Sequence, residues 1–221
     1  AFFTEITDKM ESEDLTQMIN HYLTEMSQVA LDHGATIDKY IGDGIMIFFG
    51  DPETRGVKED ALACVTMALA MQSRMAELAD TWRDSGIESP MQCRIGIHTG
   101  YCTVGNFGSA DRMDYTIIGG TVNLAARMEG QCLPGAVLMS YDTYALVRDQ
   151  IACEEVGLMS FKGLAYPIRT YRAVHVVGET APEQISLDLP HIRIAGNLSS
   201  MEEDEREQAR LAIEDLLTKL S

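Results

Sequence analysis

Two long helical segments with a hairpin between them constrain this chain more than any other feature of its sequence. Apolar residues recur at helical spacing over 12–33 and again over 57–83. Between these segments lie two β-prone runs, 35–40 and 45–49, which the turn signal Gly42-Asp43-Gly44 joins. A hairpin flanked by amphipathic helices favours a fold in which helices cover a sheet.

The rest of the chain continues this mixture of helices and strands. The expected elements, in chain order, are strands over 91–98 and 101–107 with a tight Thr99-Gly100 turn, a short strand over 115–118, a helix over 121–131, a strand over 136–140, a helix over 142–147 and two strands around Lys162-Gly163. This order predicts an α+β fold with a largely antiparallel sheet. We expect one domain over 1–177 and an extension over 178–221, with an extra strand over 185–194 and an acidic amphipathic helix over 201–220.

The composition excludes several classes of protein. The 221 residues are 46% hydrophobic, which suits a globular domain with a sizeable core. No apolar run approaches the ~18–20 residues of a membrane span, and no secretory signal is present. The formal net charge of −17 argues against a nucleic-acid binder. The five cysteines include no C-x-x-C pair, so neither a disulfide framework nor a zinc site is indicated, and we expect a reducing cytoplasm.

Three short motifs carry polar residues suited to chemistry. The first, Lys39-Tyr40-Ile41-Gly42-Asp43, is also explained by a hairpin turn that follows an exposed lysine. The second, over 119–127, places Asn123 and Arg127 on one helical face, where a local hydrogen bond between them is the alternative to a functional role. The third, Phe161-Lys162-Gly163, presents a lysine that either reaches a phosphate or faces solvent.

The combination of motifs is far more specific than its parts. In chain order it comprises Phe3-Thr4, the segment 39–43, Arg94-Ile95-Gly96-Ile97-His98-Thr99-Gly100, Asp114-Tyr115-Thr116, the segment 120–127 and Phe161-Lys162-Gly163. This set resembles the catalytic domain of class III adenylyl and guanylyl cyclases, of the bacterial adenylate cyclase type, over about residues 3–177. The resemblance implies a ferredoxin-like, palm-like fold and an enzyme of signal transduction that converts ATP to 3′,5′-cyclic AMP and pyrophosphate.

The resemblance also implies a metal site. Two aspartates hold two Mg²⁺ ions in this family, with Mn²⁺ as a substitute, and Asp43 matches the second aspartate. The first strand of the family domain and its aspartate are expected just upstream of Ala1, because Phe3-Thr4 matches the segment that follows them. Glu5 lies in the wrong register to replace that aspartate, and Phe2 stands where the family usually has glycine.

Substrate-binding roles follow from the same match. By resemblance, Asn123 orients the ribose and Arg127 donates to the α-phosphate, and we expect these two as catalytic residues. Lys162 binds the terminal phosphates with help from Phe3-Thr4 and its backbone amides. Lys39 and Thr116 match the positions that select the base, where lysine donates to adenine N1 and threonine accepts from the N6 amine.

The resemblance also implies how the subunits assemble. The family implies a homodimer with its active sites at the subunit interface, without nucleic acid and without membrane insertion by this segment. We expect the catalytic domain to lie in the cytoplasm. The sequence does not decide whether an upstream segment tethers it to the inner membrane. It also does not decide whether bicarbonate, calcium or a sensor domain regulates it. The alternatives are a guanylate cyclase, a diguanylate cyclase, whose Gly-Gly-Asp/Glu-Glu-Phe hairpin is absent, and a non-catalytic dimerisation or nucleotide-sensing module.

Overall fold

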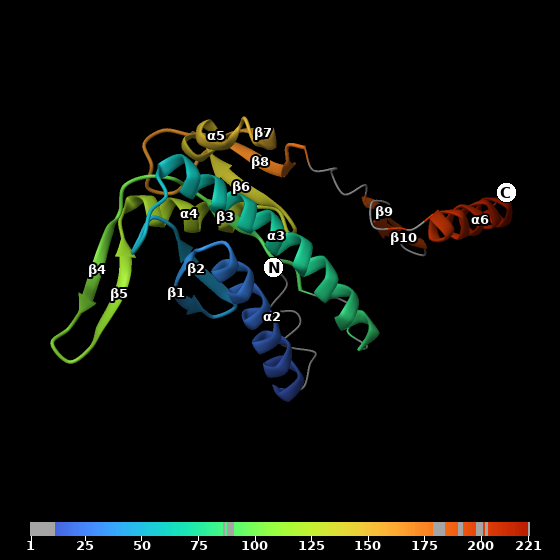
Figure 1. Ribbon diagram of the computed structural model, residues 1–221, viewed down its shortest axis with the longest axis horizontal. Coiled ribbons are helices and arrows are strands. Elements are labelled where there is room, and N and C mark those ends of the chain that lie inside the picture. The colour runs from blue at the N-terminus through green and yellow to red at the C-terminus, as the bar shows by residue number, and fades with distance from the viewer. Residues whose placement is uncertain are drawn as a thin grey trace. The chain divides into compact units, whose positions relative to one another are not determined.

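The structure is a computed structural model that describes residues 12–85, 87, 91–178, 184–189, 192–197, 201 and 203–220. The chain divides into two compact units, Ala1–Val174 and His175–Ser221, and each is described by itself. Figure 1 shows the helices and strands of both units. The first unit holds most of the motifs named above.

Helices α2 (Ser12–Asp32) and α3 (Val57–Asp84) lie side by side in the first unit (Figure 1). Both helices match their predicted ranges to within one residue, because their apolar side chains repeat at helical spacing. The shared core includes Met18, Tyr22 and Met26 from α2 and Met71, Met75, Leu78 and Trp82 from α3. Full burial of each such side chain contributes about 1.5–3 kcal/mol, so this interface is a main source of stability.

The predicted hairpin is present between these helices. Strand β1 (Thr36–Ile41) pairs antiparallel with β2 (Gly44–Phe48), and Ile41 lies opposite Gly44. The two-residue turn places Gly42 at φ 62°, a left-handed conformation that glycine adopts without steric cost. The register shifts between Ile37 and Lys39, so Asp38 is the extra residue of a β-bulge in β1.

The hairpin predicted around Thr99-Gly100 is wrong. Strand β3 (Ile95–Ile97) instead pairs in parallel with β6 (Val137–Ser140), and β4 (Thr103–Gly108) pairs antiparallel with β5 (Met113–Ile118). Side chains after β3 explain the difference. His98 Nδ1 lies 2.7 Å from Ser140 Oγ, and Thr99 Oγ1 lies 3.0 Å from Thr143 Oγ1, so the segment 98–99 is held beside β6. The β4–β5 hairpin projects from the rest of the unit (Figure 1).

A four-stranded sheet with the order β3-β6-β8-β7 completes the first unit. Its remaining strands, β7 (Ile151–Met159) and β8 (Ile168–Val176), flank Lys162-Gly163 as predicted. Helix α4 (Gly120–Gln131) packs against β3 and β6, and the short helix α5 (Tyr141–Val147) packs against α3 and β6. The predicted α+β class with mostly antiparallel pairing is therefore confirmed, and the β3–β6 pair is its parallel exception.

Helix α4 approaches β3 so closely that only glycine fits at position 96. A Cβ atom at Gly96 would lie 2.2 Å from the backbone nitrogen of Glu129 and 2.5 Å from the carbonyl oxygen of Ala125. Arg94 reinforces this packing, because its Nη2 lies 2.9 Å from Glu129 Oε1. Gly96 therefore allows α4, which carries Asn123 and Arg127, to pack directly on β3.

We expect Gly96→Ala to destabilise the protein strongly, because backbone atoms of α4 would have to move. The free energy of unfolding should fall by about 3 kcal/mol, and the melting temperature by roughly 6–12 °C, as followed by circular dichroism. Gly130→Ala is the matched control in the same helix, because a Cβ there meets nothing within 4 Å. That substitution should leave stability unchanged or raise it by about 0.5–1 kcal/mol. Equal melting temperatures for the two variants would contradict the packing described.

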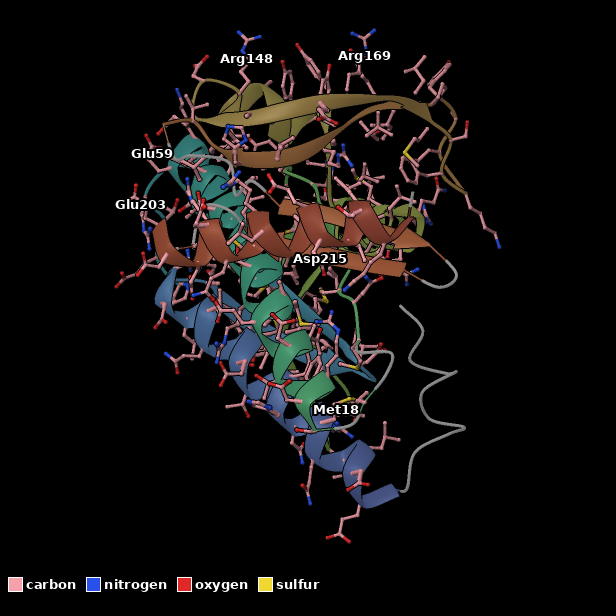
Figure 2. All side chains as sticks on the ribbon, turned by 90° about the vertical axis from the view of Figure 1, so that its right-hand side faces the viewer. Met18, Glu59, Arg148, Arg169, Glu203 and Asp215 are labelled. Atoms are coloured by element: carbon pink, nitrogen blue, oxygen red, sulfur yellow. The ribbon has the colours of Figure 1, made fainter. Side chains whose placement is uncertain are left out.

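The second unit contains a hairpin and a helix. Strands β9 (Gln184–Leu189) and β10 (Ile192–Asn197) pair antiparallel, so the single extra strand predicted over 185–194 is in fact two. Helix α6 (Glu203–Leu220) confirms the predicted acidic helix and carries ion pairs one turn apart, such as Lys219–Asp215 at 2.7 Å. Figure 2 labels Glu203 and Asp215 on it. Within the described residues, no helix is both long and apolar enough to span a membrane.

Candidate active site

Asp43 lies in the turn of the β1–β2 hairpin, where it is half-buried. Its carboxylate has no hydrogen bond or ion pair with another described residue, so its oxygens are available to a ligand. Hard carboxylate oxygens suit Mg²⁺. No group of three or more His, Cys, Asp or Glu side chains suited to a metal ion occurs among the described residues. Asp43 thus fits one ligand of a divalent cation, and the described residues alone do not complete that site.

Lys39 and Thr116 meet through a third residue, Asp38. The Thr116 hydroxyl donates a hydrogen bond to Asp38 Oδ2 over 2.7 Å, and Lys39 Nζ lies 3.7 Å from Asp38 Oδ1. The Asp38 side chain is 1% exposed and Thr116 is 6% exposed, whereas the Lys39 side chain is 41% exposed. The structure therefore joins two positions 77 residues apart, which only the family resemblance links at the level of sequence.

A second contact fixes the same strand. Tyr115, next to Thr116 on β5, donates a hydrogen bond to the carboxylate of Asp51, which follows β2. This hydrogen bond raises the pKa of the Tyr115 phenol above its usual value. Two side-chain contacts thus link β5 to the hairpin segment, one from the buried Thr116 and one from the exposed Tyr115.

Helix α4 presents Asn123 and Arg127 on one face. Leu124 and Met128, each one residue further on, are buried in a core with Phe161. Asn123 is consequently exposed and Arg127 half-buried. Within the described part of the chain, their side chains make no hydrogen bond with each other and Arg127 has no ion pair. The alternative of a local Asn–Arg hydrogen bond is not seen.

The Phe161-Lys162-Gly163 turn lies against Arg127. Gly163 has a positive φ of 82°, and a Cβ there would lie 3.5 Å from both Nη1 and Nη2 of Arg127. Phe161 anchors the turn because it is 3% exposed and packs with Leu124 of α4. Lys162 is exposed and has no ion pair with a described residue. The turn and α4 therefore place two cations in one region, and neither is neutralised by a described carboxylate.

The structure thus forms two groups of predicted residues and leaves others apart. Lys39 joins Thr116, and Arg127 joins the turn that carries Lys162. Phe3 and Thr4 lie outside the described residues. Sequence reasoning missed Asp38, although an aspartate directly after Ile37 inside a predicted strand is a signal that could have found it.

The comparisons with known proteins establish the family. The sequence profile of the adenylate and guanylate cyclase catalytic domain matches residues 1–175. The chain belongs to this family of class III nucleotide cyclases, and the match confirms the resemblance and the fold class inferred from the motifs. Members of the family generally use divalent metal ions.

Individual relatives agree with this assignment. Adenylate cyclase 1 of Rhizobium meliloti (strain 1021) is 32% identical over 179 residues, which are 79% of this chain and 26% of that protein. The crystal structure of the adenylyl cyclase CyaB from P. aeruginosa is 50% identical, covers 78% of this chain and 88% of the other, and superposes with a TM-score of 0.77. The guanylyl cyclase Cya2 is 31% identical, covers 79% and 87%, and gives a TM-score of 0.72.

The relatives differ from this chain in length and from one another in the nucleotide that their names specify. The chain spans about a quarter of the Rhizobium meliloti protein. An adenylyl cyclase and a guanylyl cyclase also share this fold at similar TM-scores. The fold by itself therefore does not select the base, and that choice falls to individual side chains.

Proposed function

We propose that this chain is the catalytic domain, over 1–177, of an adenylate cyclase in signal transduction, with an extension over 178–221. The ribose 3′-oxygen of ATP attacks the α-phosphorus and the 3′-hydroxyl loses its proton. The bond from the α-phosphorus to the bridging oxygen breaks, and 3′,5′-cyclic AMP and pyrophosphate form. The observation that supports this proposal is the contact of Lys39 and Thr116 through Asp38, which brings the two proposed base-selecting side chains together.

The base is selected by complementary hydrogen bonds. Adenine presents an acceptor at N1 and a donor at its N6 amine, whereas guanine presents a donor at N1 and an acceptor at O6. The Lys39 ammonium only donates, so it suits adenine N1. The Thr116 oxygen accepts from the N6 amine while its own proton is directed to Asp38. A polar group of guanine left unpaired at the buried Thr116 would weigh against GTP.

The phosphates are bound by the second group of residues. Arg127 donates to the α-phosphate, where negative charge develops in the transition state, and Lys162 binds the terminal phosphates. Asn123, exposed on the same helical face as Arg127, orients the ribose. Phe3-Thr4 contributes backbone and hydroxyl donors. This assignment is supported by the absence of ion pairs at Arg127 and Lys162 within the described residues of so acidic a chain.

A divalent metal ion completes the proposed site. Asp43 supplies one carboxylate ligand, and the first aspartate of the family is expected upstream of Ala1. When bound, Mg²⁺ or Mn²⁺ lowers the pKa of the 3′-hydroxyl and neutralises charge on the phosphates. The active form is a homodimer, in which Asp43 of one subunit serves the site that contains Lys39, Thr116, Asn123 and Arg127 of the other.

Product analysis tests the proposal. The full-length protein is incubated with ATP or GTP and with Mg²⁺ or Mn²⁺, and cyclic nucleotides are separated by chromatography. We expect cyclic AMP from ATP and far less cyclic GMP from GTP. Preferential formation of cyclic GMP would identify a guanylate cyclase. Failure to form either product with either metal would favour the non-catalytic dimerisation or nucleotide-sensing module.

The base-selecting pair can be tested by substitution. Lys39→Glu combined with Thr116→Cys removes the adenine pattern, and guanylyl cyclases typically carry glutamate and cysteine at these two positions. We expect the ratio of kcat/KM for ATP to that for GTP to fall by about 100-fold or more. Lys58→Glu is a control, because it reverses an exposed lysine that pairs with Asp149 on another surface. An unchanged ratio in the double variant would refute the assignment of Lys39 and Thr116.

A further inference from the structure

Asp38 has a buried carboxylate, which the proposed function uses only as the link between Lys39 and Thr116. It is the extra residue of the β1 bulge, and its side chain is 1% exposed. Consecutive side chains of a regular strand point to opposite faces, but Asp38 Oδ1 lies 3.7 Å from Nζ of the next residue, Lys39. Bulges commonly re-aim a side chain beside a functional site. Because of the bulge, the side chains of Asp38 and Lys39 lie close together although the two residues are consecutive in the strand.

The two oxygens of Asp38 have different partners. Oδ2 accepts the hydroxyl proton of Thr116 over 2.7 Å, while the competing acceptor, the Ile117 carbonyl oxygen, is 3.5 Å away. Oδ1 is buried and has no hydrogen-bond partner, since Lys39 Nζ at 3.7 Å is too distant for one. A buried carboxylate oxygen left unpaired is unfavourable, and such groups often serve function rather than stability.

A threonine hydroxyl by itself does not distinguish adenine from guanine. It carries one donor and two acceptor lone pairs, so a freely rotating hydroxyl accepts from the N6 amine of adenine or donates to O6 of guanine. Once its proton is directed to Asp38, only acceptor lone pairs remain for the base. The carboxylate thereby converts an ambiguous side chain into an acceptor.

We propose that Asp38 is a positioning residue that determines nucleotide specificity, because it fixes Thr116 as a hydrogen-bond acceptor and anchors the ammonium of Lys39. This inference rests on the proposed adenylate cyclase function and assigns the discrimination within it. Asp38 touches neither the base nor the reacting atoms, and it acts through its two neighbours. Selection of ATP is therefore the property of three side chains, Asp38, Lys39 and Thr116, which we call the selection triad.

Asp38→Asn is the sharpest test, because it keeps the shape and removes the charge. An asparagine amide can donate to Thr116, which frees the hydroxyl to donate to O6 of guanine. We expect the ratio of kcat/KM for ATP to that for GTP to fall by about 10–100-fold. The change should appear mainly in KM, while kcat with ATP stays within a few-fold of wild type. An equal fall of kcat with both nucleotides and an unchanged ratio would overturn the inference.

Two further variants separate positioning from a merely structural role. Tyr115→Phe removes the neighbouring hydrogen bond from the same strand to Asp51, so it should affect stability without altering the ATP to GTP ratio. Thr116→Val removes the hydroxyl that Asp38 orients. Adding Asp38→Asn to Thr116→Val should reduce the ratio by much less than it does in the wild-type background. Fully additive effects would show that Asp38 does not act through Thr116.

Equilibrium binding keeps this inference distinct from the proposed reaction. Binding of 3′-deoxy-ATP and 3′-deoxy-GTP, which lack the attacking hydroxyl, is measured on the same variants without turnover. If the wild-type protein binds 3′-deoxy-ATP preferentially and Asp38→Asn erases that preference, the role of Asp38 stands even if no cyclic AMP is formed. If wild type forms cyclic AMP and Asp38→Asn retains the full preference, only the Asp38 inference fails. A wild-type protein without any preference would refute both.

Discussion

Asp43→Asn should reduce cyclic AMP formation by about 1000-fold or more, because a metal carboxylate contributes several kcal/mol of charge stabilisation. Asparagine is the sharpest substitution here. It keeps the size of the side chain and is well tolerated in a two-residue hairpin turn, so the fold should survive. Circular dichroism should show a melting temperature close to that of wild type, while the cyclase assay shows the loss.

The control for this variant is Glu53→Gln, which neutralises an exposed carboxylate in the loop after β2. That protein should retain wild-type activity and the wild-type response to added Mg²⁺. The Asp43→Asn protein should need far more Mg²⁺ for whatever activity remains. Similar Mg²⁺ titration curves for the Asp43→Asn and wild-type proteins would contradict the role of Asp43 as a metal ligand.

Arg127→Ala should lower kcat by about 100- to 1000-fold, with a much smaller change in KM. The guanidinium lies at the Gly163 turn and has no ion pair among the described residues, so its loss removes a donor without exposing a buried carboxylate. Arg127→Lys should recover only a small part of the rate, because an ammonium lacks the planar fork that donates to two phosphate oxygens at once.

Arg148→Ala is the matched control for Arg127→Ala. Arg148 follows α5, is exposed, and points away from the rest of the first unit (Figure 2). Its removal should leave kcat and KM at wild-type values. Comparable losses from the two substitutions would mean that general charge, rather than the position of Arg127 beside the Gly163 turn, supports the reaction.

Mixing the two inactive variants tests the proposed dimer. If Asp43 and Arg127 act in one site from different subunits, a heterodimer of Asp43→Asn and Arg127→Ala contains one intact site and one doubly impaired site. Random association should then restore about a quarter of wild-type activity. Activity that stays at the level of the separate variants would place both residues in the same subunit's site.

The helices and the β1–β2 hairpin could be predicted because their signals are local. Apolar residues at helical spacing mark α2 and α3, and Gly42 supplies the left-handed turn residue that joins β1 to β2. The pairing of the other strands is harder to predict from the sequence. The expected hairpin around Thr99-Gly100 failed because β3 pairs with β6, some forty residues further on. No local pattern in β3 identifies that partner, since pairing is decided by contacts between distant segments.

Some residues of the candidate site can be predicted from local spacing, and others depend on contacts between distant segments. Asn123 and Arg127 share a face through helical geometry alone, so their proximity followed from their spacing. The family resemblance named Lys39 and Thr116 without showing how they meet. Asp38 escaped notice because its burial depends on a register shift against β2 and on a hydrogen bond from β5.

The sequence by itself determined the helices, the hairpin turn and the family, since these depend on periodicity, turn chemistry and the order of motifs along the chain. Only the tertiary structure decided that β3 joins a parallel pair, that Gly163 lies at the guanidinium of Arg127, and that a bulged aspartate connects Lys39 with Thr116. The physical reason is the distance along the chain over which each kind of interaction acts. Short-range preferences act within a few residues, whereas burial, register and side-chain contact are settled by segments that meet only when the chain has folded.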